Sequence, residues 1–247
     1  MKELRQRTAV VTGAAGSIGA AIARTLAADG HRLILVDIEL EKTRALASEL
    51  GTECYSTAID LSRPEQIAEK YRQAADEFGP ADILVNNAGI LSKNKLLNTN
   101  LEEWRKVFAV NLDGPFVLSQ QVLSHMIDQR WGRIVNIASF AWKSGGISSG
   151  TSYSASKAGL VGLTFTVARE TAAFGVTVNG IAPAYVMSPM VTEQLSEEER
   201  TTLLQSVPVR RFCEPEEVAH TVRFLVSPLA GFMTGVIVDM NGGFQFD

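Results

Sequence analysis

Short apolar segments alternate with helical stretches along the whole chain. The segments are rich in Val, Ile and Leu, and they span 8–11, 33–36, 55–59, 83–85, 133–138, 176–181 and 236–239. They are apolar on both faces, as strands of a parallel sheet covered by helices must be. The alternation predicts βαβ units, and therefore an α/β protein with a doubly wound, mostly parallel seven-stranded sheet and helices on both faces. No repeat or Pro/Gly-rich linker divides the 247 residues, so we expect a single domain over 1–247.

The composition excludes several classes of protein. The 23 Lys and Arg residues stand against 27 Asp and Glu residues, which gives a net charge of −4 and no basic excess for a nucleic-acid partner. No apolar run reaches the length of a membrane span, and no signal-peptide core follows the charged N-terminus. The two cysteines form no CxxC pattern, and the three histidines lack metal-ligand spacing. We therefore expect a cytoplasmic protein with no membrane or metal partner.

Three helices carry recognisable start signals. Ser62–Glu65 has the spacing of a capping box, Asn100 precedes an acidic first turn, and Glu214 is followed by Pro215 and two further acids. The most irregular stretch covers about 184–208, with a short helical piece beginning near Ser196. A long insertion after a strand in this kind of fold usually covers the ligand site, so we expect this segment to lie over the substrate.

A glycine-rich turn, Thr12–Gly19, follows the first predicted strand and opens a helix. Glycines let the backbone approach a pyrophosphate, and the helix N-terminus offers free N–H groups to the phosphates. An ordinary glycine-rich loop is the alternative interpretation. Asp37 closes the second strand, 18 residues after Gly19. A carboxylate there accepts the ribose hydroxyls of NAD and repels the 2′-phosphate of NADP, so the sequence favours NAD.

Two further polar groups follow predicted strands. Asp60 ends the third strand and Asn86-Asn-Ala-Gly89 ends the fourth, at the carboxyl edge where open α/β sheets bind ligands. A helix cap for Asp60 and a turn for Asn86 and Asn87 are the structural alternatives.

Tyr153 and Lys157 are spaced i and i+4, which places them on one face of a helix. A nearby ammonium favours the phenolate, so we expect Lys157 to lower the pKa of Tyr153 toward the range of a general acid/base. Ser139 follows a predicted strand and can hydrogen-bond a substrate carbonyl, although a capping role is the alternative. Asn111 lies inside a helix that it suits poorly, which indicates a local kink or a water site.

Together these residues resemble the classical short-chain dehydrogenase/reductase family over essentially the whole chain. The resemblance implies a Rossmann fold, Tyr153 as the acid/base, and Lys157 as the residue that binds the nicotinamide ribose and lowers the phenol pKa. It implies that Ser139 polarises the carbonyl and that Asn111 supports a water in a proton relay. With the turn and the strand ends, it places NAD against Gly13, Gly16, Ser17, Ile18, Gly19, Asp37, Asp60, Leu61, Asn87, Ala88, Gly89, Tyr153, Lys157, Pro183, Val186 and Ser188.

Two positions depart from the pattern of the family. The second glycine of the turn stands at Gly16 instead of at the place of Ser17, and Ala184 stands where a glycine often follows Pro183. Because both changes involve small residues, we expect the overall cofactor geometry to be kept. The contacts with the individual phosphates are the feature that these changes affect.

The implied reaction is reversible hydride transfer between the nicotinamide and a secondary alcohol or ketone. The substrate expected is a polyol, a cyclic alcohol or a 3-oxoacyl group. We expect the pocket to be lined by Leu91, Ala141, Trp142, Ile147, Tyr185, Met187 and Met190, with Lys143 nearby as a solvated lysine or as a partner for an anionic group.

Three alternatives remain open. The first is a 3-oxoacyl-[acyl-carrier-protein] reductase. In that group two arginines at the entrance receive the carrier, and here Arg130 matches one while Phe174 replaces the other. The second is a catalytically silent dinucleotide-sensing protein, and the third is an S-adenosylmethionine methyltransferase. The family also implies a homo-oligomer, a dimer or a tetramer, built on the helices around 112–130 and 152–174.

Overall fold

One seven-stranded sheet forms the centre of the molecule. The structure is a computed structural model, and it describes residues 6–188 and 196–246. All strand pairs are parallel, and the spatial order is β3-β2-β1-β4-β5-β6-β7. The strands are β1 (Thr8–Thr12), β2 (Arg32–Asp37), β3 (Cys54–Ala58), β4 (Ile83–Asn86), β5 (Gly132–Ile137), β6 (Val176–Pro183) and β7 (Ile237–Met240). The seven strands and their order along the chain confirm the prediction from the apolar segments.

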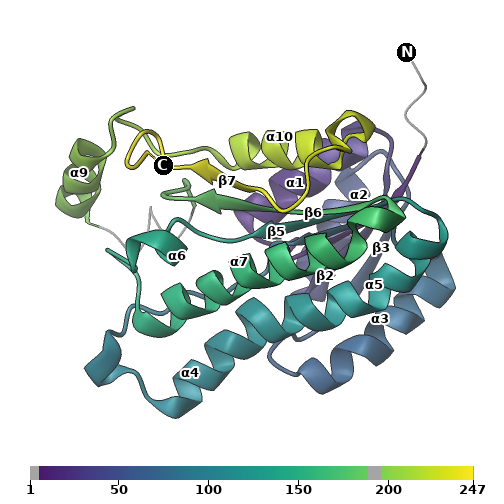
Figure 1. Cartoon of the computed structure of the whole chain (residues 1–247), viewed down its shortest axis with the longest axis horizontal. Helices are drawn as coiled ribbons and strands as arrows, with labels where there is room; N and C mark the ends of the chain where they lie inside the picture. Colours follow the sequence, from purple (N-terminus) through teal and green to yellow (C-terminus); the bar gives the residue numbers. More distant parts are fainter. Residues whose placement is uncertain (1–5, 189–195, 247) are drawn as a thin grey trace.

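Helices cover both faces of the sheet (Figure 1). On one side lie α1 (Ser17–Ala28), α2 (Leu40–Glu49) and α10 (Pro215–Val226), and on the other lie α3 (Pro64–Phe78), α4 (Leu101–Phe108), α5 (Gly114–Asp128) and α7 (Thr151–Thr171). The remaining pieces are α6 (Ala141–Ser144), α9 (Glu197–Ser206), the short turns η1 (Leu96–Asn98), η3 (Ala172–Phe174) and η4 (Pro228–Ala230), and the π-helical η2 (Ala109–Asp113). Among the described residues, no helix has the length and apolar character to cross a membrane.

The pleat of the strands explains why the apolar segments are continuous. In β2, Leu33 and Leu35 pack into the core beneath α1 and α2, whereas Ile34 and Val36 pack into the core on the opposite side. Successive side chains of a strand point to opposite faces, so a sheet covered on both faces needs apolar residues at every position. All four side chains are 0–1% exposed.

Two of the three predicted helix starts are confirmed. The Asn100 side chain accepts the N–H of Glu103 at 2.8 Å, and the Glu217 carboxylate accepts the N–H of Glu214 at 2.9 Å. The capping box at Ser62 is wrong. The Ser62 hydroxyl instead donates to Asp60, and α3 begins at Pro64 after Arg63, without a side-chain cap. The Ser62 hydroxyl is thus bound by the carboxylate of Asp60, just after β3, and does not cap α3.

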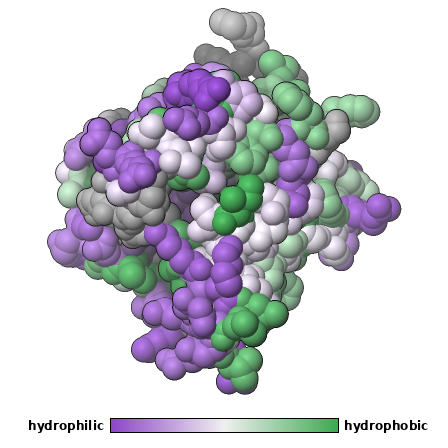
Figure 2. Space-filling model, turned by 90° about the vertical axis from the view of Figure 1, so that its left-hand side faces the viewer, coloured by the Kyte–Doolittle hydropathy of each residue, from purple (hydrophilic) through white to green (hydrophobic). Residues whose placement is uncertain are grey.

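The chain order reverses between β1 and β4. In a doubly wound sheet this reversal opens a crevice outside the carboxyl ends of the strands, which is where such sheets bind ligands. In Figure 1 the carboxyl ends point toward α6 and α9. Figure 2 views the molecule from this end and shows hydrophilic and hydrophobic groups interspersed around the site.

Candidate active site

The turn between β1 and α1 has no room for side chains at two of its glycines. Gly13 has φ +65°, and a Cβ there would lie 2.9 Å from the Cα of Ala88. A Cβ at Gly19 would overlap the carbonyl oxygen of Gly13. Gly16 precedes the first residue of α1, and its carbonyl accepts the N–H of Ala20 at 2.8 Å. The predicted strand–turn–helix arrangement is therefore present, with the N-terminus of α1 free to face an anion.

Asp37 lies at the end of β2, beside this turn. One carboxylate oxygen accepts the N–H of Ala15 at 3.0 Å, and the other accepts the N–H of Glu39 at 3.1 Å. These bonds fix the orientation of the carboxylate and leave further lone pairs on both oxygens for a ligand hydroxyl.

Asn87 joins the ends of β1 and β4. Its side-chain amide donates to the carbonyls of Thr12 (2.9 Å) and Gly13 (3.2 Å), while the Thr12 hydroxyl accepts the N–H groups of Asn87 and Ala88, both at 3.0 Å. Asn86 points the other way. Its side chain donates to Asn136 at 2.8 Å, and Asn136 donates to Thr164 of α7 at 2.9 Å. The two adjacent asparagines therefore serve the turn and the interior respectively.

Asp60 does not cap a helix, which was the structural alternative, because α3 begins at Pro64 without a side-chain cap. One of its oxygens accepts both the backbone N–H (2.9 Å) and the hydroxyl (2.6 Å) of Ser62. These hydrogen bonds lower the pKa of the Asp60 carboxyl. Asp60 also borders the large hollow described next, so the structural role does not exclude contact with a ligand.

A hollow of about 1040 Å³, here called the cofactor hollow, runs along the carboxyl ends of β1 to β4. Its lining includes most of the predicted cofactor-binding residues, namely Gly13, Gly16, Ser17, Ile18, Gly19, Asp37, Asp60, Leu61, Asn87, Ala88, Gly89 and Ser188. Its size, the glycine turn and the carboxylate at one end fit a dinucleotide.

A second hollow of about 260 Å³, here called the substrate hollow, adjoins the first and shares Ile18, Asn87, Gly89 and Ser188 with it. Tyr153, Lys157 and Ser139 line it, as do Pro183 and Val186. Three of the four proposed catalytic groups and the remaining predicted cofactor contacts therefore share the substrate hollow, next to the cofactor hollow, whereas Asn111 lines neither.

Burial raises the pKa of Tyr153 above its ordinary value, and a hydrogen bond with the Ser139 side chain opposes this rise. The expectation that Lys157 lowers this pKa is not supported. The Lys157 ammonium lies 5.8 Å from the centre of the Tyr153 ring and donates to the carbonyl of Ile137 at 2.7 Å. The phenol is therefore protonated at neutral pH, in the form that donates a proton.

Lys157 is itself a buried cation. It is 4% exposed, and burial lowers its pKa to about 8. A Cβ at Gly89 would lie 3.3 Å from both the Lys157 ammonium and the Asn111 side-chain oxygen. The ammonium thus lies against the glycine that borders both hollows.

Asn111 lies in η2, so the predicted local kink is confirmed as a π-helical turn between α4 and α5. Its side chain accepts the N–H of Ile90 at 2.9 Å and donates to the carbonyl of Ile90 (3.1 Å) and to Ser156 (3.0 Å). These bonds brace the segment after β4 against α7. The role of Asn111 in a proton relay remains a prediction.

The sequence predicted part of the lining of the substrate hollow. Leu91, Ala141, Ile147 and Tyr185 border it, whereas Trp142 and Met187 are not among the lining residues, and Met190 lies outside the described residues. Trp142 instead packs against a small buried cluster of Ala138, Val161 and Ala182. The sequence analysis missed Phe140, Ser144, Ser148 and Ser149, although their position between β5 and the tyrosine helix is a usable signal.

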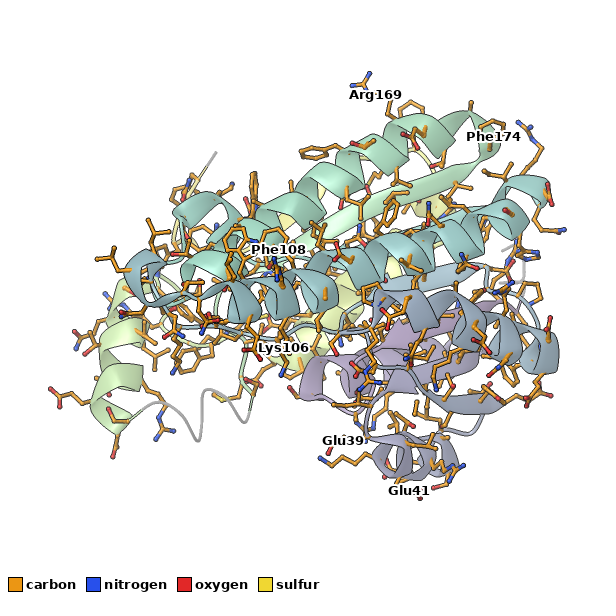
Figure 3. All side chains as sticks on the ribbon, turned by 90° about the horizontal axis from the view of Figure 1, so that it is seen from below. Glu39, Glu41, Lys106, Phe108, Arg169 and Phe174 are labelled. Carbon is orange, nitrogen blue, oxygen red and sulfur yellow. The ribbon has the colours of Figure 1, made fainter. Side chains whose placement is uncertain are left out.

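Two charged residues lie in places that the sequence did not indicate. Lys143 is neither solvated nor directed at a ligand, because it forms an ion pair with Asp239 of β7 at 2.6 Å. Arg130 and Phe174 each lie two residues before a strand, β5 and β6 respectively, at the amino end of the sheet, and the Arg130 guanidinium donates to the carbonyl of Ala173 at 3.0 Å. Figure 3 shows Phe174 at the far end of α7 from α4. Within one chain, Arg130 is therefore not at the entrance of the substrate hollow.

The comparisons with known proteins agree with this geometry. A family model described as enoyl-(acyl carrier protein) reductase matches residues 13–245. The chain is 40% identical to the 3-oxoacyl-[acyl-carrier-protein] reductase FabG of Vibrio cholerae, over 97% of this chain and 98% of that protein. It is 39% identical to the FabG of Aquifex aeolicus, over 98% of each chain. It is also 36% identical to the (2S)-[(R)-hydroxy(phenyl)methyl]succinyl-CoA dehydrogenase subunit BbsD of Thauera aromatica, over 97% of each chain.

Proposed function

The chain belongs to the short-chain dehydrogenase/reductase family, and on that premise we propose that it interconverts 3-oxoacyl and 3-hydroxyacyl thioesters with NAD(H). The observation that carries the proposal is that Tyr153, Ser139 and Lys157 line one hollow, and that this hollow adjoins the cofactor hollow and shares Asn87 and Gly89 with it. An acid/base beside a bound nicotinamide is the arrangement that hydride transfer to a ketone requires.

Each of the three side chains has a distinct task in reduction. A nicotinamide dinucleotide held in the cofactor hollow would supply the hydride for the 3-oxo carbon. As that carbon is reduced, its oxygen becomes negative, and Tyr153 donates the phenol proton to it. The Ser139 hydroxyl donates a hydrogen bond to the same oxygen and disperses its charge. The Lys157 ammonium, which lies against Gly89 at the border of the cofactor hollow, would hold the nicotinamide ribose. In the reverse direction, the phenolate removes the alcohol proton.

The lining of the substrate hollow supports a neutral acyl group. Leu91, Phe140 and Ile147 are apolar, and Lys157 is the one basic residue that the described part of the chain contributes to the lining. A free carboxylate would find no further cation there. The relatives named above include enzymes of acyl-carrier-protein and coenzyme A thioesters, so their names favour a thioester over a polyol or another simple alcohol. The names do not separate the two carriers.

A substrate panel tests the proposal. Purified protein is assayed at pH 7 with acetoacetyl-CoA, a sugar alcohol, a cyclic alcohol and a hydroxysteroid, and NADH absorbance is followed. We expect kcat/KM for the thioester to exceed that for the other substrates by about 100-fold or more, because contacts with the carrier portion of the thioester, which the other substrates lack, contribute binding energy to the transition state. Faster turnover of a sugar alcohol would contradict the thioester assignment and leave the hydride chemistry in place.

The preference for NAD is the second part of the proposal, and Asp37 supports it. Replacing Asp37 by Ser removes the carboxylate that opposes a 2′-phosphate. We expect the kcat/KM ratio of NADPH to NADH to rise by about 100-fold, since a like-charge contact costs several kcal/mol. Glu39→Gln is the matched control, because Glu39 borders the same hollow but pairs with Lys42 at 2.7 Å. An unchanged ratio in Asp37→Ser would show that Asp37 does not select the cofactor.

A further inference from the structure

Lys95 has three carbonyl partners in a loop that borders the substrate hollow. Its ammonium donates to the carbonyls of Gly146 (2.7 Å), Ser149 (2.6 Å) and Ile147 (3.5 Å). Ile147 and Ser149 line the hollow, whereas Lys95 belongs to the separate segment that follows β4. The lysine therefore connects two segments that are about fifty residues apart in the chain.

The loop has little means of fixing its own shape. Residues 145–150 read Gly-Gly-Ile-Ser-Ser-Gly, and Gly145 and Gly146 have φ of +69° and +77°. Glycine-rich segments lose much conformational entropy when they are ordered, so such a loop needs contacts from outside itself. The Lys95 ammonium donates to three carbonyls of this loop, and hydrogen bonds from a charged group are stronger than neutral ones.

The neighbouring contacts make the two segments a tight pair. The N–H of Gly150 donates to the carbonyl of Ser92 at 2.6 Å, and the N–H of Thr151 donates to Asn94 at 3.0 Å. A Cβ at Gly150 would overlap the carbonyl oxygen of Asn94. These backbone bonds hold the start of α7, which carries Tyr153. Residues 146–149 are held by Lys95 through their carbonyls, and by side-chain contacts of Ser148 with Tyr185 (3.5 Å) and of Ser149 with Ser154 (3.2 Å).

We propose that Lys95 is a positioning residue that fixes the 146–149 loop as one wall of the substrate hollow and thereby sets the affinity for the acyl thioester. The inference rests on the proposed function for the identity of the substrate. Because Tyr153 is anchored separately in α7, Lys95 acts on substrate binding and leaves the proton-transfer step largely unaffected.

The test compares Lys95→Met, Lys95→Arg and, as a control, Lys93→Met. Lys93 is an exposed lysine of the same segment, and no hydrogen bond to the 146–149 loop is seen for it among the described contacts. We expect Lys95→Met to raise KM for acetoacetyl-CoA about tenfold with kcat changed less than about threefold, since misplaced binding contacts weaken substrate positioning. Lys95→Arg retains a charged donor and should recover most of the wild-type KM.

Hydrogen exchange provides a readout that needs no substrate. We expect the amide of Gly150, whose N–H donates to Ser92 at the end of this loop, to exchange about tenfold faster in Lys95→Met, with Lys93→Met like the wild type. Unchanged exchange in Lys95→Met would overturn the inference, and so would faster exchange with an unchanged KM. If the wild type fails to reduce acetoacetyl-CoA, the proposed function fails by itself, and exchange still decides whether Lys95 holds the loop.

Discussion

Tyr153→Phe should lose turnover by about 1,000-fold or more while it still binds NADH, because the substitution removes the proton donor and retains the ring. The phenol forms a hydrogen bond with Ser139, and both residues line the substrate hollow. Steady-state rates with acetoacetyl-CoA measure the loss, and NADH fluorescence measures cofactor binding.

Tyr185→Phe is the matched control for this variant. Tyr185 also lines the substrate hollow, but its hydroxyl lies 3.5 Å from Ser148 and faces no proposed catalytic group. We expect this variant to retain kcat within about threefold, as for a residue that acts only in binding. Near-wild-type turnover by Tyr153→Phe would remove Tyr153 from the role of acid/base.

Lys157→Met should lower activity and raise stability together. The loss of the ammonium that would hold the nicotinamide ribose should misplace the hydride donor and reduce kcat by about 100-fold or more. The depression of the Lys157 pKa from 10.5 to about 8 means that the folded protein carries a destabilised cation, at a cost of roughly 3 kcal/mol. Methionine removes that cost but leaves the Ile137 carbonyl without its donor, which costs about 1 to 2 kcal/mol. We expect the free energy of unfolding to rise by about 1 to 2 kcal/mol.

The gain in stability should depend on pH in a defined direction. Below pH 8 the lysine is charged in both the folded and the unfolded protein, so the full cost of burying the charge is present. Between pH 8 and 10.5 the unfolded protein binds the proton more tightly, and the wild type becomes relatively more stable as pH rises. Urea unfolding at pH 7 and pH 9.5 should therefore show a smaller gain at the higher pH. A gain in stability that is the same at pH 7 and pH 9.5 would contradict the assignment of the stability cost to Lys157. An equal gain in the control variant Lys93→Met would contradict it as well.

The sequence predicted the architecture well because burial on both faces of a parallel sheet leaves a simple pattern. Residues such as Ile34 and Leu35, which point to opposite cores, are both apolar, as burial on both faces requires. The turn from Thr12 to Gly19 was also readable, because its glycine pattern follows a strand and opens a helix, and the lack of room at Gly19 comes from the nearby carbonyl of Gly13.

Interactions between distant segments were not readable in the same way. The sequence shows that Tyr153 and Lys157 share a helix face, but it does not show how deeply they are buried or that the ammonium donates to Ile137. Burial decided the direction of both pKa shifts, so the expected lowering of the phenol pKa was wrong. The pairing of Lys143 with Asp239 joins residues 96 apart, and no local pattern records it.

The buried chain from Asn86 through Asn136 to Thr164 has a consequence for how α7 sits on the sheet. Amides sealed in an apolar interior lose several kcal/mol if their partners move out of reach. Sliding α7 along its axis by a single residue would break this chain at Thr164, eleven residues beyond the phenol. This chain of hydrogen bonds therefore fixes how far α7 carries the Tyr153 hydroxyl toward the substrate hollow, although none of its three side chains lines either hollow.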